Sequence, residues 1–174
     1  VVFSSLGADG PAAEMICIRA GGSRLPASRD TIEHAQHTLE LRGREVFKAA
    51  VRRMSDCLHR AARELGMHAR DFDLIIPHQA NARIIEAVGS HLEADPAKLL
   101  VDVAGTGNTA AAAIPLALAR ARDAGRLKPG GMVAMVGFGA GAAWACQVLI
   151  VRGRGPGVRP AAGTPSAATF ANET

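Results

Sequence analysis

Aromatic residues are scarce in this 174-residue sequence, which contains no tyrosine, one tryptophan and five phenylalanines. With aromatic residues at 3% and hydrophobic residues at 48%, the core must consist mainly of Ala, Val, Ile and Leu. Such a composition is typical of tightly layered α/β proteins and argues against aromatic-rich binding folds. The length fits one ordinary domain with enough apolar sequence to build a core.

Cysteine is also rare, and Cys17, Cys57 and Cys146 lie far apart, without the spacing of a metal site. An odd number of isolated cysteines favours a reduced, intracellular protein, so we expect a cytoplasmic location and no bound metal. No apolar run approaches the roughly 18 residues of a membrane span, and no basic leader is evident. We therefore expect no membrane partner. The start at Val1, without an initiating methionine, suggests that a segment belongs upstream.

Positive charge exceeds negative charge only slightly, with a formal net charge of +4 and a pI near 9.5. This balance suits an acidic protein partner, although a set of solvated arginines explains it equally simply. We expect no nucleic-acid partner.

The hydrophobic pattern predicts alternating helices and strands. Apolar residues between Phe47 and Leu65 recur at steps of three and four, which indicates a helix of about five turns that Gly66 ends. Pro115 lies inside a later Ala-rich helix, where it should kink the axis or mark the first turns. Short apolar runs are typical of buried strands. The predicted helices are 44–65, 82–92 and 109–124, and the predicted strands are 14–20, 72–76, 99–103, 131–136 and 143–151, after a strand-like start at 1–6.

This order of elements predicts a three-layer α/β unit with helices packed on a mixed sheet. The last two strands, joined by a short glycine loop, should form an antiparallel pair. Residues 31–43 show no clear period, and we predict irregular structure there. We divide the chain into 1–42, a linker with the first strand, 43–151, the main domain, and 152–174, a disordered tail rich in Gly, Pro, Ala and Thr.

Two turns carry residues suited to catalysis. His78 follows an apolar run and precedes a helix, and Asn108 stands in the glycine-flanked turn before another helix. A histidine at a helix N-terminus should stay neutral, because the helix dipole disfavours its protonated form. Two such hydrogen-bond donors are able to polarise one carbonyl oxygen. The alternative, left open by the spacing, is that both residues only cap buried turns.

Four ordered motifs between residues 43 and 151 resemble the C-terminal half of 3-oxoacyl-[acyl-carrier-protein] synthase III, a thiolase-fold condensing enzyme. The motifs are Gly43-Arg44-Glu45-Val46-Phe47-Lys48, Pro77-His78-Gln79-Ala80-Asn81 with Arg83, Gly107-Asn108-Thr109 with Ile114-Pro115, and Gly137-Phe138-Gly139-Ala140-Gly141 with Trp144. The resemblance implies a three-layer α-β-α, thiolase-like half with a mixed five-stranded sheet.

The resemblance also implies roles for individual residues. His78 and Asn108 would hold the thioester carbonyl of malonyl-carrier protein while it loses carbon dioxide. Phe138 matches a phenylalanine beside the active site, with core packing as the alternative. Gly139 and Ala140 match the glycine-rich oxyanion loop.

Lys48 and Arg83 match basic positions that dock the acidic acyl carrier protein, with simple solvation as the alternative. The implied substrates are acyl-CoA and malonyl-carrier protein, with no separate cofactor, and the complete enzyme would be a homodimer.

The nucleophile of that family is a cysteine in its N-terminal half, and no cysteine here matches it. Ala110 and Ala142 are smaller departures that concern specificity. We therefore expect the chain to be a fragment that does not condense substrates alone. Two alternatives remain: a related thiolase-fold acyltransferase or polyketide starter synthase, and a non-catalytic remnant or interaction subunit.

Overall fold

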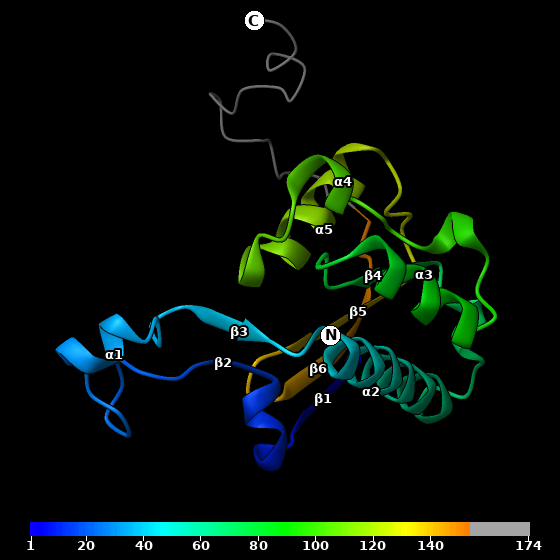
Figure 1. Ribbon diagram of the computed structural model, residues 1–174. Helices are drawn as coiled ribbons and strands as arrows, with labels where there is room; N and C mark the ends of the chain where they lie inside the picture. The colour runs from blue at the N-terminus through cyan, green and yellow to red at the C-terminus, as the bar shows by residue number, and fades with distance from the viewer. Residues whose placement is uncertain (154–174) are drawn as a thin grey trace, which may run out of the picture.

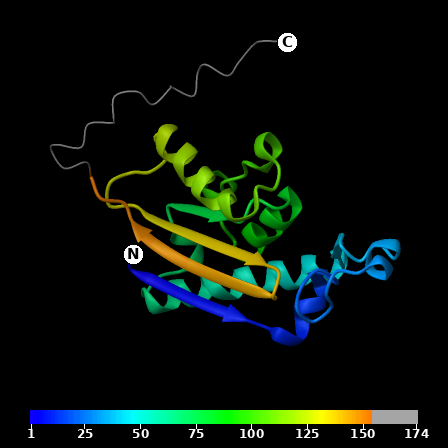
Figure 2. The same cartoon turned by 90° about the vertical axis from the view of Figure 1, so that its left-hand side faces the viewer.

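The computed structural model describes residues 1–153, and its centre is a mixed sheet of four strands in the order β1-β6-β5-β4. Strands β4 and β5 are parallel, and the other neighbours are antiparallel (Figure 2). The strands are β1 (Phe3–Ala8), β4 (Leu74–Pro77), β5 (Met132–Gly139) and β6 (Ala143–Ile150). The α/β class is confirmed, but the sheet has four strands instead of five, because the segments predicted as strands at 14–20 and 99–103 lie outside it and β1, at the start of the chain, belongs to it.

The strand predicted at residues 99–103 is wrong. The segment makes one parallel bridge, between Ile75 and Leu99, and Leu100 N donates to Ile75 O at 2.9 Å. Pairing stops there because the side-chain oxygen of Gln79 accepts the backbone N–H groups of Asp102 and Val103. The short helix α4 (Val103–Thr106) then begins.

Helices cover both faces of the sheet, which gives the three predicted layers (Figure 1). Helices α2 (Gly43–Glu64) and α3 (Ala82–His91) pack on one face, and α5 (Ala113–Asp123) packs on the other. Strand β4 is buried on both sides, since Ile75 joins the core under α2 while Leu74 and Ile76 join the core under α5. No helix in residues 1–153 is long and apolar enough to span a membrane.

The predicted helix ends agree closely with the structure. Helix α2 stops at Glu64, and Gly66 adopts a φ of +71°, which glycine tolerates without strain. The Ala-rich helix is divided into a 3-10 turn over Ala110–Ala112 and then α5. Pro115 is the third residue of α5, so it marks the first turn.

The predicted antiparallel pair is confirmed as the hairpin of β5 and β6, in which Gly139 pairs with Ala143. Trp144 lies opposite Phe138 on one side and Gly7 of β1 on the other. The guanidinium carbon of Arg53 lies 4.3 Å from the Trp144 ring centroid, and Arg53 also pairs with Asp9 at 3.1 Å. These contacts fix the hairpin end against β1 and α2.

Residues 16–41 form an arm that projects from the body of the molecule (Figure 1). Its two strands, β2 (Ile16–Ile18) and β3 (Leu39–Leu41), pair antiparallel with each other outside the main sheet. The prediction of a strand at 14–20 is thus confirmed only for its centre. The irregular structure predicted for residues 31–43 is wrong in part, because it misses β3 and the end of α1 (Arg29–Glu33).

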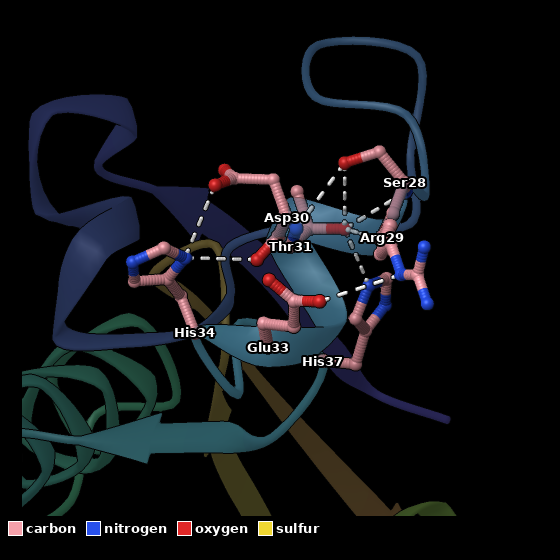
Figure 3. A network of polar contacts seen from close by, with 7 residues as sticks. All are labelled: Ser28, Arg29, Asp30, Thr31, Glu33, His34 and His37. Atoms are coloured by element: carbon pink, nitrogen blue, oxygen red, sulfur yellow. Dashed lines mark hydrogen bonds and ion pairs between the residues drawn. The ribbon is translucent and has the colours of Figure 1, made fainter.

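A small polar network holds the tip of the arm (Figure 3). Ser28 caps α1, because its Oγ accepts the Thr31 N–H at 3.2 Å and its own N–H donates to Thr31 Oγ1 at 2.9 Å. The imidazole Nε2 of His37 lies 2.9 Å from the same Thr31 hydroxyl. Local hydrogen bonds therefore order a segment that has little apolar packing.

Of the predicted tail, residues 154–174 lie outside the described part of the chain. The boundary at residues 42 and 43 stays a prediction; β1 belongs to the same sheet as β4 to β6.

Candidate active site

A cavity of about 470 Å³ opens where β4, β5 and the ribbon of β2 and β3 come together. Most residues that line the cavity are apolar, and the polar side chains in the lining are those of His78 and Asn108. The apolar walls come from the ribbon, helices α2 and α3, the turn before α5 and α5 itself. They include Ile16, Leu39, Leu41, Val46, Ala50, Met54, Ile84, Ala110, Ala111 and Ile114.

His78 directly follows β4, and its backbone N–H donates to Val136 O of β5 at 2.8 Å. The side chain is half-buried, and burial lowers the pKa of its imidazole, which favours the neutral ring. The direction of this shift agrees with the sequence prediction, but burial is its cause, and the predicted place at a helix N-terminus is wrong. Helix α3 begins only after its cap Asn81, whose Oδ1 accepts the Arg83 N–H at 2.9 Å, so His78 lies outside the helical turn.

Asn108 follows Gly107, which ends α4 with a φ of +67°. The Asn108 Oδ1 accepts the Ala110 N–H at 3.0 Å, and this bond fixes the orientation of the amide. Within residues 1–153, its Nδ2 makes no hydrogen bond, and neither does either ring nitrogen of His78. Both side chains at the cavity therefore keep N–H groups available for a ligand.

Phe138, Gly139 and Ala140 line the same cavity at the end of β5. Phe138 is 8% exposed and belongs to the core, so it both packs the interior and forms part of the wall. The predicted oxyanion loop is the start of the β5–β6 turn, where Gly141 takes a φ of +136°. The structure thus brings all three residues to His78 and Asn108.

Lys48 and Arg83 are not at the cavity. Both are exposed, on α2 and on the first turn of α3, and neither makes an ion pair among the described residues. Arg52, one turn after Lys48, forms an ion pair in which its Nε lies 3.8 Å from Asp56 Oδ2. Both basic residues therefore lie on the surface, outside the lining of the cavity.

None of the three free cysteines lines the cavity. Cys57 and Cys146 are buried, and desolvation raises the pKa of both thiols, to about 12 for Cys146. Cys17 lies on β2 beside a different hollow. Residues 1–153 hold no group of His, Cys, Asp and Glu side chains that could bind a metal.

Sequence reasoning missed two parts of this region. Gln79 was part of a recognised motif, but its buried amide contacts were not anticipated. The ribbon residues Ile16, Leu39 and Leu41 were not placed at the site either. Alternating apolar residues in Leu39-Glu40-Leu41 were the available signal, but three residues are too few to establish a period.

Comparison with known proteins gives consistent results. The family model described as 3-oxoacyl-[acyl-carrier-protein] synthase III C terminal matches residues 62–151. A β-ketoacyl-[acyl-carrier-protein] synthase III of Clostridioides difficile is 42% identical over 149 residues, covering 86% of this chain and 45% of the relative.

Two solved structures share the fold. The 3-oxoacyl-(acyl carrier protein) synthase III of Pseudomonas aeruginosa superimposes with a TM-score of 0.75 at 35% identity, covering 88% of this chain and 44% of that one. The priming β-ketosynthase of the R1128 polyketide pathway gives a TM-score of 0.71 at 30% identity, covering 86% and 44%.

The chain therefore spans less than half of each of these relatives. The matched region begins within α2 and runs through β4, α3, the Asn108 turn and the β5–β6 hairpin. It therefore includes the predicted site residues that line the cavity, which are His78, Asn108, Phe138, Gly139 and Ala140. With more than half of its residues matched by the family model, the chain belongs to the 3-oxoacyl-[acyl-carrier-protein] synthase III C-terminal family.

Proposed function

We propose that the chain is the C-terminal half of a ketoacyl synthase III-type acyltransferase. The reaction would be decarboxylative Claisen condensation of an acyl primer with malonyl-acyl carrier protein, in fatty acid or polyketide synthesis. The observation that carries this proposal is the pair His78 and Asn108, which line one cavity with free N–H groups in a chain of this family.

The first step would be loss of carbon dioxide from the malonyl group. His78 and Asn108 would donate hydrogen bonds to the thioester carbonyl oxygen. The bond between the α-carbon and the carboxylate breaks, carbon dioxide leaves, and the electron pair forms an enolate whose negative charge lies on that oxygen. A neutral imidazole suits this role, because it donates without needing a proton from solvent.

The second step would join two carbon atoms. The α-carbon of the enolate attacks the carbonyl carbon of an acyl group held as a thioester on a cysteine. The new carbon–carbon bond forms, the cysteine leaves as a thiolate, and a 3-oxoacyl thioester results. We assign the backbone at Gly139 and Ala140 to the second carbonyl oxygen, since both residues line the cavity.

The cysteine for this step would come from a complementary N-terminal half. Cys57 and Cys146 have raised thiol pKa values in the core, and no cysteine lines the cavity. Relatives more than twice as long as the aligned region are consistent with a second half. Alone, the chain would not condense substrates.

The acyl carrier protein would dock on the surface that carries Lys48 and Arg83. Their exposure, without ion pairs in the described part of the chain, leaves both charges available to an acidic partner. The apolar cavity suits an acyl chain, and acyl-CoA and malonyl-carrier protein would be the substrates, with no further cofactor. We further propose a homodimeric complete enzyme in the cytoplasm, where free cysteines such as these three persist.

Carbon dioxide release from a malonyl thioester tests the proposal. The complete protein, assembled from this chain and its upstream half, should release carbon dioxide and form an acyl-enzyme, whereas the chain alone should form none. His78→Ala or Asn108→Ala should lower release about 10²- to 10³-fold. The matched control, His59→Ala, changes an exposed histidine of α2. Stable acylation of the chain alone would contradict the proposal.

The match to a priming β-ketosynthase of a polyketide pathway favours a starter synthase as the second candidate. Such an enzyme would also decarboxylate, so the primer that acylates the complete protein separates the two. A thiolase-fold acyltransferase acting on oxygen or nitrogen would transfer the acyl group without releasing carbon dioxide. If the assembled protein does neither, a non-catalytic interaction subunit is the better description, and size measurement of the chain with its partner half would test it.

A further inference from the structure

The amide of Gln79 joins the two turns that carry His78 and Asn108. Gln79 is the residue directly after His78, and it is only 1% exposed, although its side chain is polar. A buried primary amide is costly unless hydrogen bonds satisfy it. The partners of this amide are therefore informative about its role.

Four hydrogen bonds use the full capacity of the amide. Its Nε2 donates to the carbonyl oxygens of Pro77 at 2.7 Å and Leu100 at 3.1 Å. Its Oε1 accepts the N–H groups of Asp102 at 2.6 Å and Val103 at 3.2 Å. A glutamine amide has two donors and two acceptor positions, so all are occupied, and they fix which end is nitrogen.

These partners lie on both sides of the site. Pro77 ends β4 directly before His78, whereas Leu100, Asp102 and Val103 belong to the segment that leads through α4 to Asn108. The same segment is also held by Arg120 of α5, whose Nη1 lies 2.7 and 2.9 Å from the two carboxylate oxygens of Asp102. The Gln79 side chain thus links this segment to the end of β4, directly before His78.

We propose that Gln79 is a positioning residue that sets the distance and orientation between the His78 imidazole and the Asn108 amide. The proposal rests on the proposed function, in which both groups hydrogen-bond to one oxygen atom. Gln79 itself does not line the cavity and need not touch substrate. A shift of the segment from Leu100 to Val103 would move Asn108 relative to His78, because α4 follows at once and Gly107 ends it.

Two substitutions test this role in the complete protein. Gln79→Met keeps the length and removes all four hydrogen bonds, whereas Gln79→Glu keeps the shape and removes the two N–H donors. Both should lower kcat for carbon dioxide release from a malonyl thioester by about 10- to 100-fold while KM changes little, since the misplaced pair costs transition-state stabilisation. Gln147→Glu is the matched control, because Gln147 is exposed on β6.

Amide hydrogen exchange of this chain gives a readout that does not depend on activity. The N–H groups of Asp102 and Val103 should exchange faster in Gln79→Met than in the unchanged chain, while that of His78, held by Val136 O, should keep its protection. Folded Gln79 variants with unchanged kcat, or with unchanged exchange at Asp102 and Val103, would overturn the proposal. An unchanged protein that releases no carbon dioxide would refute the proposed function instead, and the exchange experiment would still decide whether Gln79 holds the two turns together.

Discussion

Replacement of Gly7 by alanine should destabilise the hairpin end that carries the cavity wall. A Cβ at Gly7 would lie 2.4 Å from both Cε2 and Nε1 of Trp144 and 2.6 Å from Cζ2. Ordinary contacts between carbon atoms are about 3.5–4.0 Å long, so the methyl group and the indole would overlap by more than about 1 Å. Either β1 or the ring must move, and overpacking of this kind costs about 1–3 kcal/mol.

Movement of the ring has a second cost. The Arg53 guanidinium, 4.3 Å from the ring centroid, would lose its stacking, which is worth about 0.5–1 kcal/mol at a partly exposed site. The total is about 1.5–4 kcal/mol, and for a chain of this size we expect the melting midpoint to fall by roughly 3–16 °C. Because Trp144 is the single tryptophan and the chain has no tyrosine, its fluorescence emission should report the same displacement.

Thermal unfolding followed by circular dichroism, together with the emission spectrum before heating, tests this expectation. Gly10→Ala is the matched control, because a Cβ there meets no atom within 4 Å. Removal of glycine at an unstrained position should leave the midpoint unchanged or raise it slightly. If Gly7→Ala and Gly10→Ala melt together and emit alike, the argument that Trp144 packs on a bare backbone at Gly7 is refuted.

Three further predictions concern residues around the site. Because burial lowers the pKa of His78, the unfolded chain binds a proton there at a higher pH than the folded chain does. The free energy of unfolding should therefore fall as the pH drops below the ordinary histidine pKa. The pH dependence of urea unfolding should weaken in His78→Asn. In the folded chain, iodoacetamide should alkylate Cys17 first and the buried Cys57 and Cys146 slowly, whereas in urea all three should react at similar rates. Peptide mass mapping measures these rates. Equal rates in the folded chain would contradict the burial of Cys57 and Cys146. Asn81→Ala should cost about 1 kcal/mol by removing the cap on the Arg83 N–H, and Asn81→Ser should restore most of it; equal melting of both variants would disprove the cap.

Long periodic segments were predictable from sequence because their own packing determines them. The stretch from Phe47 to Leu65 presents one apolar face over several turns, and α2 buries that face in the structure. The hairpin of β5 and β6 followed from two apolar runs around a short glycine loop. Both signals are local, and both survived in the structure.

Segments of three to five residues were not predictable in the same way. The run from Leu99 to Val103 has the composition of a strand, yet a single side chain, Gln79, captures two of its N–H groups and ends the pairing. The ribbon strands are three residues each and show no usable period. In both cases a distant contact outweighs the local preference.

The candidate site was partly accessible from sequence for a different reason. His78 and Phe138 stand at the ends of β4 and β5, which were predicted correctly, and Asn108 stands in a predicted turn, although the strand predicted before that turn is wrong; the fold brings all three to one cavity. Their chemical roles stay predictions. The cause of the His78 pKa was not accessible, since it depends on burial and on the position at which α3 begins.

The walls of the cavity differ in how firmly they are held. On one side, β4 and β5 belong to the main sheet, whereas the ribbon lies outside it, and its two strands share a ladder of three residue pairs and the exposed Arg19–Glu40 ion pair. A two-stranded ribbon of this kind has little stability of its own. A ligand that fills the cavity would therefore order the ribbon as it binds. The heat-capacity change of binding should then be more negative than the value expected for burial against a rigid wall alone. Binding affinity should then vary gradually with ligand size, because the ribbon is able to move to fit the ligand, whereas β4 and β5 are fixed in the main sheet.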